Sequence, residues 1–194
     1  MTERPFTLDP VEWAAWLPTV DAATATPEQL AALDKSPASA RTSPYFLTLA
    51  HDVEALAQRS PLFNAVMYAS GGLPRAEREL ATVAVSYING CVYCASVHAR
   101  RFSELTKKPE IIQRLYDEGL GTALEPRHRA IVDYAEKLTR APDAATGADL
   151  AALRAAGLTD PEIVDLTHAI AMFAWANRLM LTLGEPVDAI RSGE

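Results

Sequence analysis

The sequence is poor in cysteine, in positive charge and in long apolar runs, and each shortage excludes a class of protein. Two cysteines among 194 residues are too few for a small secreted domain held together by disulfides. The 25 acidic residues outnumber the 18 Lys and Arg, and the formal charge of −7 argues against a nucleic-acid partner. The longest apolar run, residues 169–176, is far shorter than the ~20 residues that cross a bilayer, and no basic amphipathic stretch indicates a membrane surface.

The remaining composition indicates one domain with a large core. A chain of 194 residues, 49% of them hydrophobic, can enclose a single continuous core. Residues 1–5 lack the charged and then apolar order of a secretory signal. We therefore expect the protein in the cytoplasm.

Prolines and capping residues predict an all-α fold. Most prolines precede stretches with helical apolar spacing, where the missing N–H of proline costs least. Thr26 and Gln29 fit a capping box, and Gly119 and Gly157 fit the glycines that end helices. No segment alternates convincingly as a strand would. The expected helices cover residues 10–17, 27–34, 44–58, 61–70, 74–88, 92–107, 109–118, 126–140, 147–156 and 161–183.

The helices group into three parts. We predict an N-terminal arm with short helices over 1–43, a single-domain helical bundle over 44–184, and a C-terminal tail over 185–194. The last helix, 161–183, is apolar on nearly every side, which is typical of a helix buried on all sides. In so small a domain a second subunit would supply part of that burial, so we expect a homo-oligomer. The alternative is a central helix of a monomeric bundle.

The two cysteines, Cys91 and Cys94, directly follow a helix-breaking Asn89-Gly90 pair. A new helix therefore begins at or just after Cys91. Its unpaired N–H groups favour the thiolate over the thiol, whose ordinary pKa is ~8.5. A disulfide between these positions would close too short a loop to stabilise the fold much. The spacing thus predicts a reactive pair.

A histidine and a glutamate complete the candidate site. His98 follows Cys94 by one helical turn, so its imidazole can take or relay the thiol proton. Glu79 lies on the preceding helix at the edge of an apolar stripe, where a carboxylate needs a partner. His98 is a natural partner, and together with the cysteines it would form a Cys–His–Glu relay.

Each of these residues also has a simpler interpretation. Glu79 could pair with Arg75 one turn earlier on a solvated face. His98 could be a core histidine bonded to a carbonyl, and the cysteines could be inert buried thiols.

Zinc is a further alternative, because Cys91, Cys94 and His98 would supply three ligands. A structural zinc ion takes four, usually from two well-separated pairs. The other histidines of the chain lack the spacing of a fourth ligand: His51, His128 and His168.

The spacing of Glu79, Cys91, Cys94 and His98 resembles that of the AhpD-like alkylhydroperoxidases of the carboxymuconolactone decarboxylase superfamily. The resemblance covers roughly residues 44–184 and is closest to the peroxidase-related branch. At one position the chain departs from the AhpD pattern, because Tyr93 stands between the cysteines in place of a histidine. The segments that share the resemblance are 78–80, 89–91, 135–139, 153–160 and 177–179.

The resemblance implies an all-helical oligomer (a dimer, trimer or hexamer) that reduces organic hydroperoxides and needs no metal or organic cofactor. Cys94, nearest to His98, would be the peroxidatic thiol that becomes a sulfenic acid. Cys91 would resolve it as a disulfide, which an unknown thiol reductant reopens. His98 and Glu79 would pass protons to and from Cys94.

Two other functions compete with this one. The first is a lactone-processing decarboxylase, although superfamily members of that type act without the cysteine pair. The second is a non-catalytic helical oligomer whose cysteine pair is a redox sensor or a zinc clip.

Overall fold

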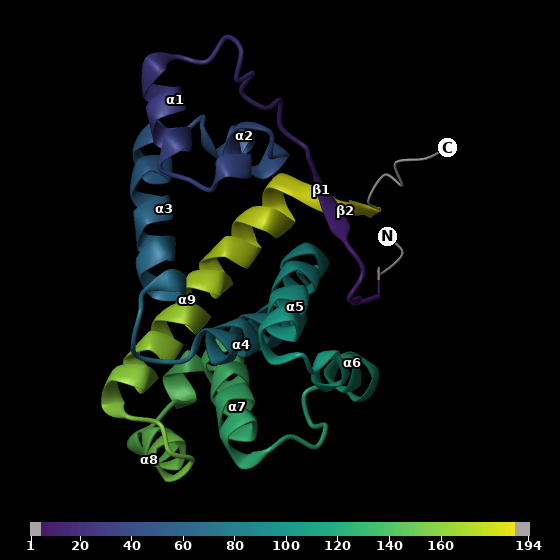
Figure 1. Cartoon of the computed structure of the whole chain (residues 1–194), viewed down its shortest axis with the longest axis vertical. Helices are drawn as coiled ribbons and strands as arrows, with labels where there is room; N and C mark the ends of the chain where they lie inside the picture. The colour runs from purple at the N-terminus through teal and green to yellow at the C-terminus, as the bar shows by residue number, and fades with distance from the viewer. Residues whose placement is uncertain (1–4, 189–194) are drawn as a thin grey trace. The chain divides into compact units, whose positions relative to one another are not determined.

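The computed structural model describes residues 5–188, and the regular structure there is almost entirely helical, which confirms the predicted all-α class. The α-helices of this part of the chain (Figure 1) are α1 (Pro27–Asp34), α2 (Pro44–Leu49), α3 (Val53–Tyr68), α4 (Arg75–Ile88), α5 (Val92–Thr106), α6 (Pro109–Glu118), α7 (Pro126–Arg140), α8 (Gly147–Ala155) and α9 (Asp160–Leu183). Shorter elements are the 3-10 helices η1 (Ala38–Arg41) and η2 (Pro142–Ala144) and the strands β1 (Val11–Ala15) and β2 (Gly184–Asp188). No helix between residues 5 and 188 is both long and apolar enough to cross a membrane.

The described chain divides into two compact units. The first unit comprises residues 5–11 and 70–177, and the second comprises residues 12–69 and 178–188. Helices α4 to α8 and every residue of the predicted site belong to the first unit. The domain bounds expected from the sequence stay a prediction, and residues 189–194 of the expected tail lie outside the described residues.

Helix α4 forms the centre of the first unit and packs against α5 and α7 (Figure 1). Leu80, Val83 and Val85 are fully buried on it. Burial of an aliphatic side chain of this size contributes about 1.5–3 kcal/mol. Because α4 is buried on several sides, its polar side chains must also find partners inside the protein.

Within the first unit, residues 5–11 pack against helices α4, α5 and α6. The ring of Phe6 is 4.6 Å from that of Tyr87 at the end of α4 and 5.5 Å from that of Tyr116 on α6. The hydroxyl of Ser96 on α5 donates a 2.6 Å hydrogen bond to the backbone oxygen of Asp9. This segment is therefore fixed by aromatic stacking and by one backbone contact.

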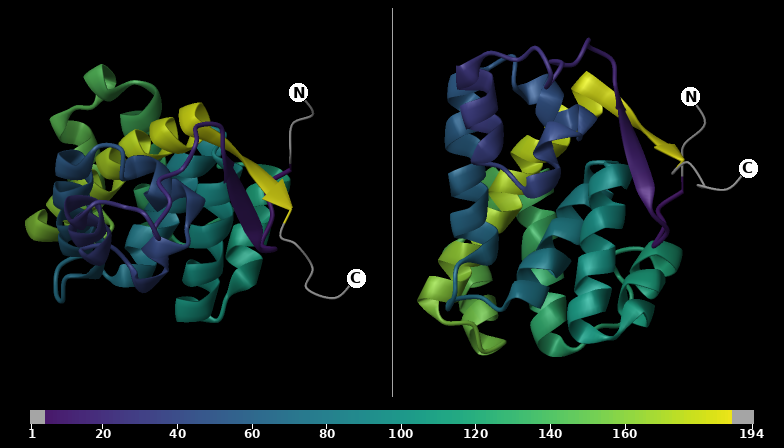
Figure 2. Two further views of the ribbon diagram at one scale, coloured as in Figure 1. Left: turned by 90° about the horizontal axis from the view of Figure 1, so that it is seen from above. Right: turned by 45° about the horizontal axis from the view of Figure 1, so that its top comes forward.

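The helix expected over residues 10–17 is wrong, because residues 11–15 form strand β1. β1 pairs with β2 from the other end of the chain, and the two strands lie side by side in Figure 2. The indole N–H of the buried Trp13 donates a 3.0 Å hydrogen bond to the backbone oxygen of Met180. A side chain at Gly184 would overlap the Trp13 ring and the backbone oxygen of Ala14. A strand whose partner is so distant in sequence leaves little local signal.

The expected boundary at Pro61 is also wrong. The structure places the break at residues 50–52, and α3 continues through Pro61. The side chain of Asp52 accepts a 3.0 Å hydrogen bond from the N–H of Ala55 and caps α3. A proline inside a helix removes one backbone hydrogen bond, but it does not define where the helix begins when a better cap precedes it.

The capping box and the two glycines predicted to mark helix ends are confirmed. Thr26 and Gln29 form the predicted capping box of α1. Gly119 and Gly157 follow α6 and α8 with φ angles of 84° and 89°, a left-handed region that glycine adopts without strain.

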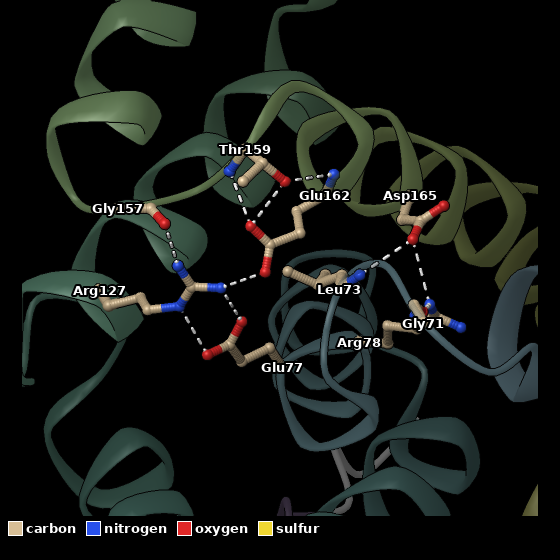
Figure 3. Close-up of polar contacts among 9 residues, drawn as sticks. All are labelled: Gly71, Leu73, Glu77, Arg78, Arg127, Gly157, Thr159, Glu162 and Asp165. Atoms are coloured by element: carbon tan, nitrogen blue, oxygen red, sulfur yellow. Dashed lines mark hydrogen bonds and ion pairs between the residues drawn. The ribbon is translucent and has the colours of Figure 1, made fainter.

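Three elements of the first unit are held together by an arginine cluster, by which we mean Arg127 with Glu77 and Glu162 (Figure 3). Arg127 on α7 donates to Glu77 on α4 at 2.8 and 2.9 Å, to Glu162 on α9 at 2.9 Å and to the backbone oxygen of Gly157 at 2.7 Å. The hydrogen bonds to Glu77 raise the pKa of Arg127. Arg127 therefore links three helices through one permanently charged group.

A second contact in Figure 3 fixes the entry to α4. The guanidinium of the buried Arg78 donates to the backbone oxygen of Gly71 at 2.8 Å and to the carboxylate of Asp165 at 3.1 Å. The same Asp165 oxygen accepts a 3.0 Å hydrogen bond from the N–H of Leu73. The loop before α4 is thus fastened to α9.

Candidate active site

The turn between α4 and α5 places the cysteines. α4 ends at Ile88, and Gly90 takes a φ of 75°, which lets the chain reverse without a side-chain clash. The N–H of Cys91 then donates a 2.8 Å hydrogen bond to the backbone oxygen of Ser86. Cys91 is the residue that precedes α5, and Cys94 is in its first turn, as the Asn-Gly pair predicts.

Both cysteines are buried, with exposed fractions of 2% for Cys91 and 6% for Cys94, and no disulfide joins them. The pKa of the Cys91 thiol is lowered, chiefly by a hydrogen bond from the Cys94 side chain. Burial opposes this by disfavouring the charge, while the Cys94 backbone N–H and the Asn177 side chain add to the lowering. The local environment of Cys91 therefore favours the thiolate despite its burial.

Glu79 and His98 form the other half of the site. The carboxylate of Glu79 is fully buried, and one of its oxygens bonds Nδ1 of His98. The other oxygen accepts two hydrogen bonds from the guanidinium of Arg75, one of them 2.6 Å long from Nε. Glu79 therefore pairs with both Arg75 and His98, but the solvated face expected for the Arg75 pair is wrong, because Glu79 is fully buried. We call Arg75, Glu79 and His98 the relay cluster.

The relay cluster fixes the charge of Glu79 and the orientation of His98. Burial raises the pKa of Glu79, but the charges and hydrogen bonds of His98 and then of Arg75 outweigh it and lower that pKa overall. An ionised Glu79 accepts the Nδ1 proton of His98, so Nε2 is the nitrogen available for proton exchange. The ring of Phe173 on α9 packs edge-on against the imidazole, 4.4 Å away at 78°.

The structure thus joins Glu79 to His98 and Cys91 to Cys94. His98 lies one turn after Cys94 on α5, and both are buried. The expected contact between the imidazole and the Cys94 sulfur stays a prediction. Tyr93, between the cysteines, is half-buried.

Asn177 is a polar residue of the site that the sequence alone did not single out. Asn177 on α9 is fully buried and donates a 3.2 Å hydrogen bond to the hydroxyl of Ser86. Its carbonyl oxygen accepts a 3.1 Å hydrogen bond from the amide of Asn89. The signal that could have found Asn177 is a lone amide in a helix that is otherwise apolar there.

Metal binding finds no support in the described part of the chain. Between residues 5 and 188 no three His, Cys, Asp or Glu side chains group as ligands of a metal ion. The three other histidines, which lack the sequence spacing of a fourth zinc ligand, have other surroundings. His51 bonds the backbone oxygen of Pro18 at 2.8 Å, His128 lies 3.4 Å from Glu125, and His168 is exposed.

With a buried cysteine pair and a Glu–His pair on α4 and α5, the fold and site define a class of protein. The model of the carboxymuconolactone decarboxylase family matches residues 54–137. The chain belongs to the superfamily that includes this family and the AhpD-like proteins.

Two solved structures similar to the chain are of proteins described as peroxidase-related. The chain is 30% identical to the alkylhydroperoxidase AhpD core of an uncharacterised peroxidase-related protein from Ralstonia eutropha. That match covers 87% of this chain and 90% of the other, with a TM-score of 0.73. It is also 30% identical to an uncharacterised peroxidase-related protein from Silicibacter, over 70% of this chain and 73% of the other, with a TM-score of 0.63.

A third similar structure is a candidate AhpD-type antioxidant defence protein of unknown function from Agrobacterium tumefaciens. It is 24% identical over 70% of this chain and 91% of the other, with a TM-score of 0.61, which shows a shared fold alone. The search of curated proteins found no match.

Proposed function

We propose that the protein is a thiol-dependent peroxidase that reduces organic hydroperoxides through Cys91 and Cys94. The observation that carries this proposal is the fully buried Glu79 bonded to His98, one helical turn from a buried, unbridged cysteine pair. A fully buried carboxylate is costly, and its pairing with an imidazole is useful where a proton has to be moved. The likeness to peroxidase-related structures supports the same class of reaction.

In the first step the Cys94 thiol passes its proton to Nε2 of His98, and the Glu79 carboxylate stabilises the imidazolium that results. The Cys94 thiolate then attacks the outer oxygen of the hydroperoxide. The S–O bond forms as the O–O bond breaks. The departing alkoxide takes the proton from His98 and leaves as the alcohol, and Cys94 becomes a sulfenic acid.

The second step is the attack of the Cys91 thiolate on the sulfur of that sulfenic acid. The S–S bond forms, the S–O bond breaks, and the departing hydroxide takes a proton from solvent and becomes water. An external dithiol then reduces the disulfide by exchange and is itself oxidised. The pair returns to the dithiol state.

The decisive experiment follows both thiols through one turnover. The reduced protein is mixed with one equivalent of cumene hydroperoxide, free thiols are counted, and mass spectrometry locates the oxidation. We expect loss of both thiols, no peroxide consumption by Cys94→Ser, and a trappable sulfenic acid at Cys94 in Cys91→Ser. A sulfenic acid at Cys91 in Cys94→Ser, with peroxide still consumed, would reverse the two roles.

The decarboxylase that names the matched family is tested separately. We expect no loss of 4-carboxymuconolactone with the wild-type protein. Turnover of this lactone that survives in the Cys91→Ser, Cys94→Ser double variant would contradict the peroxidase proposal. Repeated turnover of peroxide with a dithiol reductant, rather than a single oxidation, separates an enzyme from a redox sensor.

We also propose that the protein works as a homo-oligomer. On α9, the large apolar side chains of Val164 and Trp175 are 54% and 40% exposed. A second subunit that covers part of α9 would remove this apolar surface from water. Light scattering on the purified protein measures the mass, and a monomer at micromolar concentration would disprove the proposal.

A further inference from the structure

Asn177 is a fully buried amide whose hydrogen bonds go to two residues at the turn that carries Cys91. An amide side chain has an acceptor oxygen and two N–H donors, and each is costly to bury without a partner. The oxygen accepts from Asn89, and one N–H donates to Ser86, whose backbone oxygen accepts the N–H of Cys91. Because the donation from Asn89 identifies the oxygen end, the NH₂ end of Asn177 is turned toward Ser86 and has a second N–H to donate, and the Asn177 side chain contributes to the lowered pKa of Cys91.

We propose that Asn177 is a positioning residue for Cys91: it fixes the turn that carries this cysteine through Asn89 and Ser86, and its second N–H donates to the Cys91 sulfur. For its catalytic consequence this inference rests on the proposed function, in which the Cys91 thiolate attacks the Cys94 sulfenic acid. A thiolate performs this attack and a thiol does not. Asn177 therefore governs formation of the disulfide and leaves the attack on peroxide unchanged.

The surroundings of Asn177 favour this role over simple packing. The neighbouring buried side chains on α9, Ile170, Phe173 and Ala176, are apolar. Phe173, one turn earlier, packs on the imidazole of His98. The same face of α9 thus contacts His98 through Phe173 and the turn before Cys91 through Asn177. Asn177 is the single amide of this face, and it contributes to the lowered pKa of Cys91.

The test uses a protein with one thiol, so that its readout needs no peroxidase activity. The chain has only two cysteines, and in Cys94→Ser the remaining thiol is Cys91. Into this background go Asn177→Leu, which has similar size and no donor, and Asn177→Asp, which has the same shape and a negative charge. Ser86→Ala is the matched control, because it leaves the amide in place. The rate of alkylation by iodoacetamide is measured from pH 5 to 10.

We expect alkylation at pH 7 to fall about tenfold in Asn177→Leu, since a hydrogen bond to a charged group is lost. It should fall further in Asn177→Asp, because the carboxylate repels the thiolate, and stay within about twofold in Ser86→Ala. Glu79 and His98, the titratable groups of the same site, are unchanged in every variant. If Asn177 only stabilised the fold, its replacement would lower the melting temperature and leave the pH dependence of alkylation unchanged. An unchanged pH dependence in folded Asn177→Leu and Asn177→Asp therefore overturns the inference. Asn177→Ser, whose side chain is shorter, tests the same loss if the leucine variant does not fold.

A second measurement, with both cysteines present, tests the catalytic consequence. After one equivalent of cumene hydroperoxide, Asn177→Leu should consume peroxide at the wild-type rate but accumulate a sulfenic acid at Cys94 that dimedone traps. Disulfide formation as fast as in the wild type would contradict the role in resolution. If the wild-type protein consumes no peroxide, the proposed function fails, while the alkylation profile still decides whether Asn177 holds the Cys91 thiolate.

Discussion

Helix α4 contributes a carboxylate to each of two polar clusters that use similar residues and differ in one side chain. In the arginine cluster Glu77 meets the guanidinium of Arg127, and in the relay cluster Glu79 meets the imidazole of His98. A guanidinium keeps its proton at any physiological pH, whereas an imidazole gains and loses one readily. Only the relay cluster stands beside the cysteine pair on α5.

The comparison separates polar groups that hold the fold from those that move protons. In the arginine cluster, the guanidinium of Arg127 bonds two carboxylates and a backbone oxygen, so its contacts join elements of the fold (Figure 3). In the second unit a buried cation is stabilised in another way: Arg59 lies over aromatic rings, 3.9 Å from the centre of the Phe63 ring. A buried charge indicates function, therefore, only when its partner can exchange a proton.

The largest difference between the two clusters is expected in the rate of peroxide reduction, when Glu79 or Glu77 of α4 is replaced by neutral glutamine. Glu79→Gln should slow peroxide reduction by about 100-fold, because the imidazolium loses its counter-ion and the neutral imidazole loses the acceptor that fixes its tautomer. Glu77→Gln, two residues earlier on α4, should leave the rate per folded molecule within about twofold. Stopped-flow peroxide consumption checks both, and equal losses in the two variants would remove the distinction between the clusters.

Removal of the shared guanidinium is the next largest effect. Arg127→Met leaves Glu77 and Glu162 facing each other without their common partner. The free energy of unfolding should fall by about 2 kcal/mol, less than for a fully buried pair because Arg127 is 25% exposed. Urea unfolding measures this, and thiol alkylation of the folded variant should stay at the wild-type rate. A stability change below the error of the method would show that the cluster contributes nothing to folding.

Two glycines before α4 provide a matched pair for the contact with Asp165. Both have positive φ, 83° at Gly71 and 64° at Gly72, so alanine is strained at either by about 1 kcal/mol. A Cβ at Gly72 would also overlap the Asp165 carboxylate, while one at Gly71 meets nothing within 4 Å. Gly72→Ala should therefore lower the free energy of unfolding by about 1 kcal/mol more than Gly71→Ala. Equal losses in thermal unfolding would mean that Asp165 adjusts freely.

The smallest effect is the pH dependence that Glu79 adds to stability. Its pKa in the folded protein lies below the ordinary value of 4.5. The stabilisation from its ionised form is therefore complete above that value and is lost as the pH falls through the lower, folded pKa. The stability advantage of the wild type over Glu79→Gln should accordingly be larger at pH 7 than at pH 3. Urea unfolding at both values measures it, and a constant or growing difference on acidification contradicts the sign.

Much of the fold was predictable because its signals are local. Proline, capping residues and glycine predicted the bounds of α1 and of the helices from α4 to α9 to within a few residues. The errors fall where distant contacts decide. β1 depends on a partner at the other end of the chain, and the start of α3 depends on which of two nearby signals, Asp52 or Pro61, prevails.

For the site, the sequence by itself determined the residues that neighbouring turns bring together. Spacing along one helix places Cys91, Cys94 and His98 in register, because a helix repeats every 3.6 residues. The tertiary structure alone decided that Glu79 pairs with His98 and Arg75 at once, and that Asn177, 86 residues after Cys91, bonds Ser86 and Asn89 at the turn before it. The physical reason is that covalent geometry fixes neighbours in the chain, whereas partners across a core are chosen by packing and by the cost of leaving buried polar groups without hydrogen bonds.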